Sequence, residues 1–178
     1  MSDPSSRSSA SSGGTAGRGR GRELALWILC HLEAHPADER AAALALFWAE
    51  PPAIELDDPF LTPALARELG SLVADEPVHR FATRLVDRWL ARADHWDGLI
   101  EAQSQRWRLA RMDRVDRNVL RLVALELAGE STPRAVVVAE AVRLAARYGS
   151  ERSPAFVNGV AEALAKRLRD ESPSVEPS

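Results

Sequence analysis

The chain has 178 residues, of which 46% are hydrophobic and 28% are charged, proportions typical of a globular protein with one ordinary core. No apolar run approaches the roughly 18 residues of a membrane span and no signal-like segment opens the sequence, so we expect a cytoplasmic protein and exclude membrane and secreted classes. A single cysteine, Cys30, excludes an intramolecular disulfide and a cysteine-built metal site.

The net charge of −3 is unevenly distributed along the chain. Residues 1–30 carry a net charge of +2, residues 31–80 carry −7, and residues 81–178 carry +2. A basic start and a mildly basic C-terminal half beside an acidic middle would suit an anionic ligand held at one end of the molecule. A solvated surface of mixed sign explains the same numbers, so charge alone does not decide between the two.

Residues 1–21 are rich in Ser, Gly and Arg and contain almost nothing to bury. Such a segment cannot offset the entropy of ordering itself, so we predict a disordered basic arm. Arg18, Arg20 and Arg22 alternate with glycines immediately before the first apolar stripe. They place positive charge at a helix start, where backbone amides also favour phosphate.

Apolar residues at three- and four-residue spacing predict helices through most of the remaining chain. The first five are expected at Leu24 to Leu32, Ala37 to Glu50, Pro63 to Ala74, Val78 to Arg92, and Asp94 to about Trp107. An acidic segment at residues 50–58 interrupts them, and the sequence assigns it no role.

Three further helices are expected in close succession, at residues 113–129, 133–149 and 154–168. Pro133 and Pro154 each follow a hydroxyl residue, the arrangement that opens a helix. The run Val136-Val137-Val138 favours a strand by propensity, but the helical periodicity continues past it and outweighs a few tenths of a kcal/mol per residue. Gly159 lies inside the last helix, which predicts close approach by the backbone of a neighbouring helix.

These elements predict an all-α fold of about seven to eight helices in two packed helical subdomains. The helical domain is expected at residues 22–169, with subdomains at about 22–74 and 78–169. Residues 170–178 are expected to form a flexible tail.

The sequence shows no apparatus for catalysis, and we expect neither an enzyme nor a cofactor. His31 and His35 stand four residues apart, but Pro36 follows directly and no third metal ligand is near in sequence. The glycines near the N-terminus follow no strand, so they do not form a phosphate-binding loop.

Three segments carry a resemblance to a known family: VDRNVLRLVALEL at residues 115–127, AEAVRLAARYG at 139–149, and FVNGV at 156–160. With them the chain resembles the NusB family of bacterial transcription antitermination factors. The resemblance covers most of the chain but not residues 33–79 or those beyond Arg169. It implies a non-catalytic protein that binds boxA-like single-stranded RNA together with NusE, a small-subunit ribosomal protein. Such a protein would act in an antitermination complex with RNA polymerase and support ribosomal RNA transcription.

Carried over residue by residue, the resemblance assigns RNA contacts to the basic start and to the loop after residue 148. The RNA-binding candidates are Arg18, Arg20, Arg22, Tyr148, Arg152 and Phe156. The family usually has an acidic residue at the place of Arg152 and an Asn at that of Ala139. From the sequence pattern alone, a core position at a helix end is the favoured explanation for both Tyr148 and Phe156.

The resemblance also assigns NusE contacts to Asp116 and to Cys30, where the family often has an aromatic residue. Two alternatives stay open: a NusB-like helical accessory or protein-interaction module that lacks RNA binding, and the helical module of a ribosomal RNA cytosine methyltransferase. The methyltransferase would need a long α/β domain after Leu168, where this sequence has ten residues.

Overall fold

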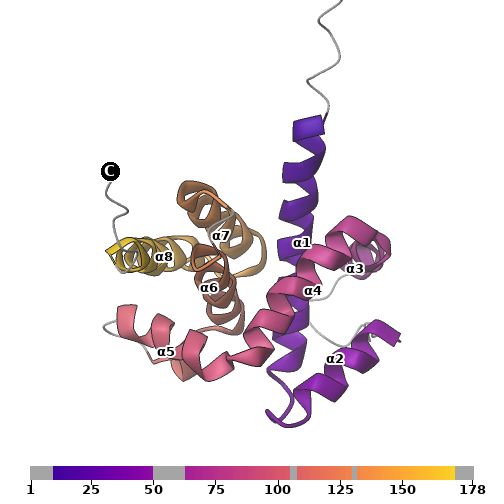
Figure 1. The fold of residues 1–178 in the computed structure, drawn as a ribbon, viewed down its shortest axis with the longest axis horizontal. Helices are drawn as coiled ribbons and strands as arrows, with labels where there is room; N and C mark the ends of the chain where they lie inside the picture. Colours follow the sequence, from indigo (N-terminus) through magenta and orange to yellow (C-terminus); the bar gives the residue numbers. More distant parts are fainter. Residues whose placement is uncertain (1–9, 50–62, 105–107, 130–131, 171–178) are drawn as a thin grey trace, which may run out of the picture. The chain divides into compact units, whose positions relative to one another are not determined.

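The protein is all-helical in a computed structural model that describes residues 10–49, 63–104, 108–129 and 132–170 (Figure 1). These segments form eight α-helices and one short 3-10 helix, and the described residues include no strand. The elements are α1 (Ala10–Leu32), α2 (Arg40–Ala49), α3 (Pro63–Ala74), α4 (Glu76–Ala91), α5 (Ala93–Gln103), η1 (Leu109–Arg111), α6 (Arg114–Leu127), α7 (Arg134–Tyr148) and α8 (Ser153–Asp170). The predicted all-α class is therefore confirmed, and the valine run of α7 is helical as expected.

The chain divides into two compact units, Met1–Val86 and Asp87–Ser178. The division falls inside α4, whereas the sequence places it between residues 74 and 78. Because α4 continues through the division without a break in its helix, no linker composition marks it.

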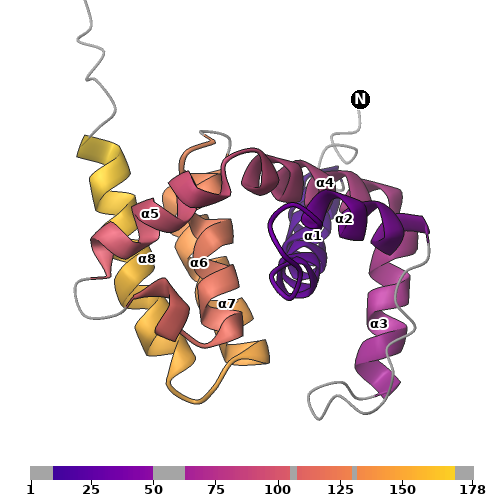
Figure 2. The same cartoon turned by 90° about the horizontal axis from the view of Figure 1, so that it is seen from below.

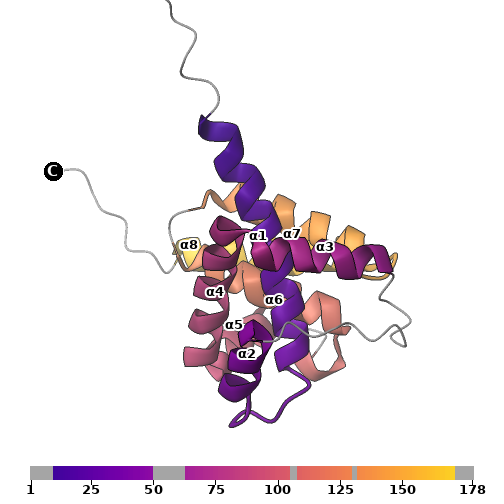
Figure 3. The ribbon, with the colours of Figure 1, turned by 90° about the vertical axis from the view of Figure 1, so that its right-hand side faces the viewer.

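Helix α1 is the centre of the first unit and packs against α2 and α3 (Figure 3). Leu24, Ile28 and Leu29 are fully buried, and so is Leu32 at the end of the helix. A helix that is buried on most of its circumference acts as a core element rather than as a surface helix.

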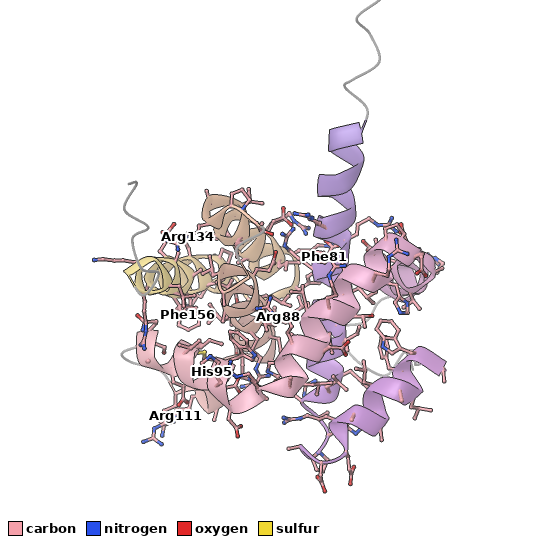
Figure 4. The ribbon with its side chains drawn as sticks, viewed as in Figure 1. Phe81, Arg88, His95, Arg111, Arg134 and Phe156 are labelled. Atoms are coloured by element: carbon pink, nitrogen blue, oxygen red, sulfur yellow. The ribbon has the colours of Figure 1, made fainter. Side chains whose placement is uncertain are left out.

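The start of α1 differs from the sequence-based prediction. The helix begins at Ala10, so residues 10–21 are helical where a disordered arm was expected; residues 1–9 and 171–178 lie outside the described part. Two tertiary contacts within the first unit hold the C-terminal end of this segment in the helix. Arg20 forms an ion pair of 2.7 Å with Asp75, and a Cβ added to Gly21 would lie 2.6 Å from Cδ1 of Phe81, which is labelled on α4 in Figure 4. Once the buried part of α1 exists, each added residue gains a hydrogen bond without a new nucleation cost.

In the second unit, α6 packs against α5, α7 and α8 (Figures 1 and 2). Helices α7 and α8 lie side by side in opposite directions, and Nη1 of Arg134 at the start of α7 donates to the carbonyl of Ala165 late in α8 at 3.4 Å. Every residue of α6 from Asn118 to Leu127 is buried. Polar side chains in that stretch must therefore find partners inside the protein.

Arg121 meets this requirement with a buried network. Its Nε and Nη2 donate to the two carboxylate oxygens of Asp97 on α5 at 2.8 and 2.7 Å, and its Nη1 donates to Oδ1 of Asn118 at 2.9 Å. The guanidinium carbon also lies 4.9 Å from the ring centroid of Trp89, a fully buried residue. The two-pronged pairing and the stacking use the planar shape of arginine, which lysine lacks.

Gly159 does not mark the close helix approach that the sequence predicts. It is exposed on α8, and a Cβ built there would meet no atom within 4 Å. Gly149, just after α7, is the opposite case, because a Cβ there would lie 2.5 Å from Oγ of Ser153 and 2.7 Å from the carbonyl oxygen of Ala145.

Gly159→Ala is expected to raise the free energy of unfolding by about 1 kcal/mol, since alanine in an exposed helix interior avoids the conformational entropy cost of glycine. The matched change Gly149→Ala is expected to lower it by about 1–3 kcal/mol, because the new methyl group overlaps neighbouring atoms. Urea unfolding of both variants beside the unchanged protein measures the two effects. A destabilised Gly159→Ala variant would show that this position needs glycine for a reason absent from the fold.

Candidate nucleic-acid interface

The turn between α7 and α8 is held by hydrogen bonds that converge on Ser153. The backbone N–H of Ser150 donates to Oγ of Ser153 at 2.9 Å, and the two hydroxyl oxygens lie 3.1 Å apart. The backbone N–H of Ser153 donates back to the carbonyl of Ser150 at 3.0 Å. Because Ser153 is fully buried and Gly149 lies against it, the turn is compact and ordered by its own side chains.

Three predicted RNA contacts are placed at this turn by the ends of two helices. Tyr148 is the last residue of α7 and Phe156 lies in the first turn of α8; both are half-buried. Arg152 is exposed within the turn, and its carbonyl accepts a hydrogen bond of 3.2 Å from the N–H of Phe156. Within the described part of the chain, the guanidinium of Arg152 has no ion pair. The side chains of Tyr148 and Phe156 are thus partly buried and partly exposed to solvent.

A fourth residue of this region was missed by sequence reasoning. Arg147 is exposed on the last turn of α7, and its guanidinium carbon lies 5.2 Å from the ring centroid of Tyr148. A cation at this distance over an aromatic face is attracted to it. The only sequence signal for this contact was that Arg147 directly precedes Tyr148. Adjacent residues on a helix do not normally face one another, so this signal did not predict the contact.

The predicted contacts on α1 have different surroundings from one another. Arg18 is exposed, and among the residues that the structure describes it has no ion pair. Arg20 is half-buried and paired with Asp75. Arg22 is only 3% exposed, with its guanidinium carbon 5.5 Å from the ring centroid of Phe81. Arg18 and Arg22, four residues apart, lie on the same face of α1, but Arg22 belongs to the part of the helix that is buried. Of the three arginines, only Arg18 is therefore fully presented to solvent.

Asp116, which the resemblance assigns to partner binding, is buried. It lies in the first turn of α6 and is 5% exposed. Burial, the largest cause, raises the pKa of Asp116; the hydrogen bond from Ser153 opposes this, and the charge of Asp113 adds to the rise. Its Oδ1 atom has no hydrogen-bond partner among the described residues. The role of Asp116 in partner binding stays a prediction.

The raised pKa gives Asp116→Asn a pH-dependent effect on stability. The folded protein holds this proton more tightly than the unfolded chain, so the stability contributed by protonated Asp116 is lost as pH rises from the ordinary carboxyl pKa through the raised one. Asn cannot ionise, so the free energy of unfolding of the variant is expected to exceed that of the unchanged protein by most at pH 7. This difference in free energy should shrink toward pH 3. Denaturant unfolding at both pH values measures it; a difference that does not change with pH would show that Asp116 titrates normally.

Cys30, the other predicted partner contact, is half-buried on α1. It lies in the first unit and Asp116 lies in the second. That Cys30 and Asp116 both contact NusE therefore stays a prediction.

The described residues hold no group of three or more His, Cys, Asp or Glu side chains placed to bind a metal ion. Among the same residues, no helix is long and apolar enough to cross a membrane.

The profile of the NusB family matches residues 21–166, which include both the buried part of α1 and the turn between α7 and α8. The chain belongs to the NusB family. It is 43% identical over 152 residues to the transcription antitermination protein NusB of Sorangium cellulosum, a match that covers 85% of this chain and 93% of that protein. The NusB protein of Syntrophotalea carbinolica is 37% identical over 153 residues, covering 85% of this chain and 94% of that protein.

Solved structures agree on the NusB fold. The structure of T. maritima NusB superimposes with a TM-score of 0.58 at 27% identity, covering 84% of this chain and 90% of that chain. The solution structure of NusB from Aquifex aeolicus gives a TM-score of 0.61 at 23% identity, covering 91% of this chain and 96% of that chain, and supports the fold alone. The NusB resemblance predicted from the three sequence segments is thus confirmed.

Proposed function

We propose that this member of the NusB family is a non-catalytic RNA-binding factor in transcription antitermination. It binds boxA-like single-stranded RNA together with NusE, and through the antitermination complex with RNA polymerase it supports ribosomal RNA transcription. Family membership and the names of the relatives support the role in antitermination.

The turn between α7 and α8 carries the RNA part of the proposal. Arg152, an exposed arginine without an ion pair in the described structure, lies in the turn between the helix ends that carry two half-buried aromatic residues, Tyr148 and Phe156. Proteins bind single strands by pairing arginine with phosphate while bases stack on aromatic side chains. Arg18 supplies a further exposed cation in the other unit.

The test follows from counterion release. Each phosphate contact with single-stranded nucleic acid contributes about 0.7 to the slope of log affinity against log salt, so Arg18→Ala and Arg152→Ala should each flatten this slope by roughly that amount. Arg22→Ala should leave the slope unchanged and lower stability instead, because Arg22 is buried against Phe81. Fluorescence anisotropy with a labelled boxA-like RNA at several salt concentrations measures the slopes.

Arg111→Ala is the matched control, since Arg111 is an exposed arginine of the second unit outside the proposed site. A slope that falls equally in Arg111→Ala would indicate diffuse attraction to any basic surface. If no RNA is bound with or without NusE, the protein is instead a NusB-like helical protein-interaction module.

A further inference from the structure

One aromatic ring of the first unit is contacted by arginines from two helices. The guanidinium carbons of Arg22 on α1 and of Arg84 on α4 both lie 5.5 Å from the ring centroid of Phe81. Phe81 is half-buried on α4 and lies directly against α1, since a Cβ added to Gly21 would be 2.6 Å from its Cδ1 (Figure 4). A cation over an aromatic face is attracted to it, so this ring gathers positive charge from both helices.

The two arginines at the ring differ in exposure. Arg22 is 3% exposed, so its contact with Phe81 is part of the packing of α1. Arg84 is exposed, and among the residues that the structure describes it forms no ion pair, not even with the exposed Asp87 three residues later. Stacking on the ring limits the directions in which its guanidinium can point. A long side chain that is already ordered loses less conformational entropy when it binds a ligand.

The carboxylates at the start of α4 are already paired with other arginines. Asp75 forms an ion pair of 2.7 Å with Arg20, and Glu76 forms one of 3.0 Å with Arg80. Neither carboxylate therefore compensates the charge of Arg84. An exposed guanidinium without a carboxylate partner has its hydrogen-bond donors available for an anion, and their planar arrangement matches the oxygens of a phosphate group.

Arg18 extends the same basic surface along α1. It stands four residues before Arg22, which places the two on one face of the helix about one turn apart. Proteins bind single strands with basic surfaces that follow the phosphate backbone. Two exposed arginines from different helices, Arg18 and Arg84, thus belong to the surroundings of one ring, and both can bind the same strand.

We propose that Arg84 is a further RNA-binding residue: held by the ring of Phe81, it contacts a phosphate of the strand that Arg18 binds. This role rests on the proposed function and adds α4 to the RNA-binding surface of the first unit. Phe81 is a positioning residue, because it contacts the arginine and not the RNA.

The salt dependence of RNA binding tests the role of Arg84. Arg84→Ala is expected to flatten the slope of log affinity against log salt by about 0.7, the contribution of one phosphate contact with a single strand. Arg84→Lys keeps the charge and is expected to keep the slope. Fluorescence anisotropy with a labelled boxA-like RNA at several salt concentrations measures both variants.

Arg80→Ala is the matched control. Arg80 is exposed one turn earlier on the same helix, but it is paired with Glu76. Its replacement removes the same charge from the same helix and is expected to leave the slope unchanged.

Two variants of Phe81 test the positioning role. Phe81→Tyr keeps an aromatic face and is expected to keep the RNA affinity. Phe81→Leu removes the ring and is expected to weaken RNA binding about 2- to 5-fold, while the salt slope stays the same because Arg84 keeps its charge. In the free protein, the ring shifts the NMR signals of the Arg84 side-chain protons upfield, and Phe81→Leu is expected to abolish this shift. Affinities are corrected for the folded fraction from thermal unfolding of each variant.

An unchanged salt slope in Arg84→Ala would overturn the RNA contact, and so would an equal flattening in Arg80→Ala, which would indicate diffuse attraction to α4. Equal affinities of Phe81→Leu and Phe81→Tyr would overturn the positioning role. Absence of RNA binding by the unchanged protein would instead remove the proposed function. If RNA is bound and Arg152→Ala flattens the slope while Arg84→Ala does not, the proposed function stands without Arg84.

Discussion

Replacing Asp97 with Ala is expected to lower the free energy of unfolding by about 3–5 kcal/mol, the usual result of removing one partner of a buried ion pair. The side chain of Arg121 is 6% exposed and that of Asp97 is 27% exposed, and two hydrogen bonds of 2.8 and 2.7 Å join them. Without Asp97, the guanidinium keeps its bond to Asn118 and its stacking on Trp89 but loses the two hydrogen bonds to a carboxylate. The loss of this two-pronged ion pair at a buried guanidinium then opposes folding.

The ion pair between Arg80 and Glu76 is the matched control for this prediction. Their side chains are 60% and 69% exposed, so Glu76→Ala should change stability by no more than about 0.5 kcal/mol. Replacing both members of the buried pair, by Asp97→Leu with Arg121→Met, should recover much of the loss, since no isolated charge remains. Urea unfolding measures all three variants. If Asp97→Ala lowers the free energy of unfolding by as little as Glu76→Ala does, Arg121 reaches water or another anion.

Phe156→Ala is expected to weaken RNA binding by about 1–3 kcal/mol, or roughly 5- to 150-fold, if a base stacks on this ring. Phe156, labelled in Figure 4, is half-buried at the start of α8. The adjacent Val157 is fully buried. The loss of stability should therefore be smaller than the about 3–5 kcal/mol that truncation of a fully buried phenylalanine causes. The salt slope should not change, because the ring contacts no phosphate.

Phe47→Ala provides the comparison, because Phe47 on α2 is 2% exposed and belongs to the core of the first unit. It should lose stability and keep the RNA affinity of its folded fraction. Melting temperature and RNA affinity, measured side by side, separate a binding ring from a packing ring. If Phe156→Ala behaves like Phe47→Ala, Phe156 should be removed from the proposed site.

The helices could be predicted from sequence because their signals are local. Proline after a hydroxyl residue and apolar residues at helical spacing placed α7 and α8 to within one or two residues. The start of α1 could not be predicted in this way. Its glycines and serines favour disorder locally, and the contacts made by Arg20 and Gly21 come from residues that lie far along the chain.

The candidate site was predictable only in part, for the same physical reason. The family resemblance indicated Tyr148, Arg152 and Phe156, and the structure places them at successive points along one connection. The buried Arg121 pairs with Asp97, which lies 24 residues away on another helix. A helical wheel shows that a charged residue is on the apolar side or the polar side of its own helix, but it does not show which other helix supplies the partner.

The burial of α6 also sets the order in which the second unit can form during synthesis. Its neighbours α7 and α8 follow it in the chain, so α6 leaves the ribosome before most of the surface that covers it exists. Domains fold as units as the chain emerges, and exposed apolar helices in the meantime are targets for aggregation and for chaperones. The C-terminal helix α8 therefore completes the fold of this unit. Until it is available, the helix with the longest buried stretch in the unit lacks part of the surface that covers it.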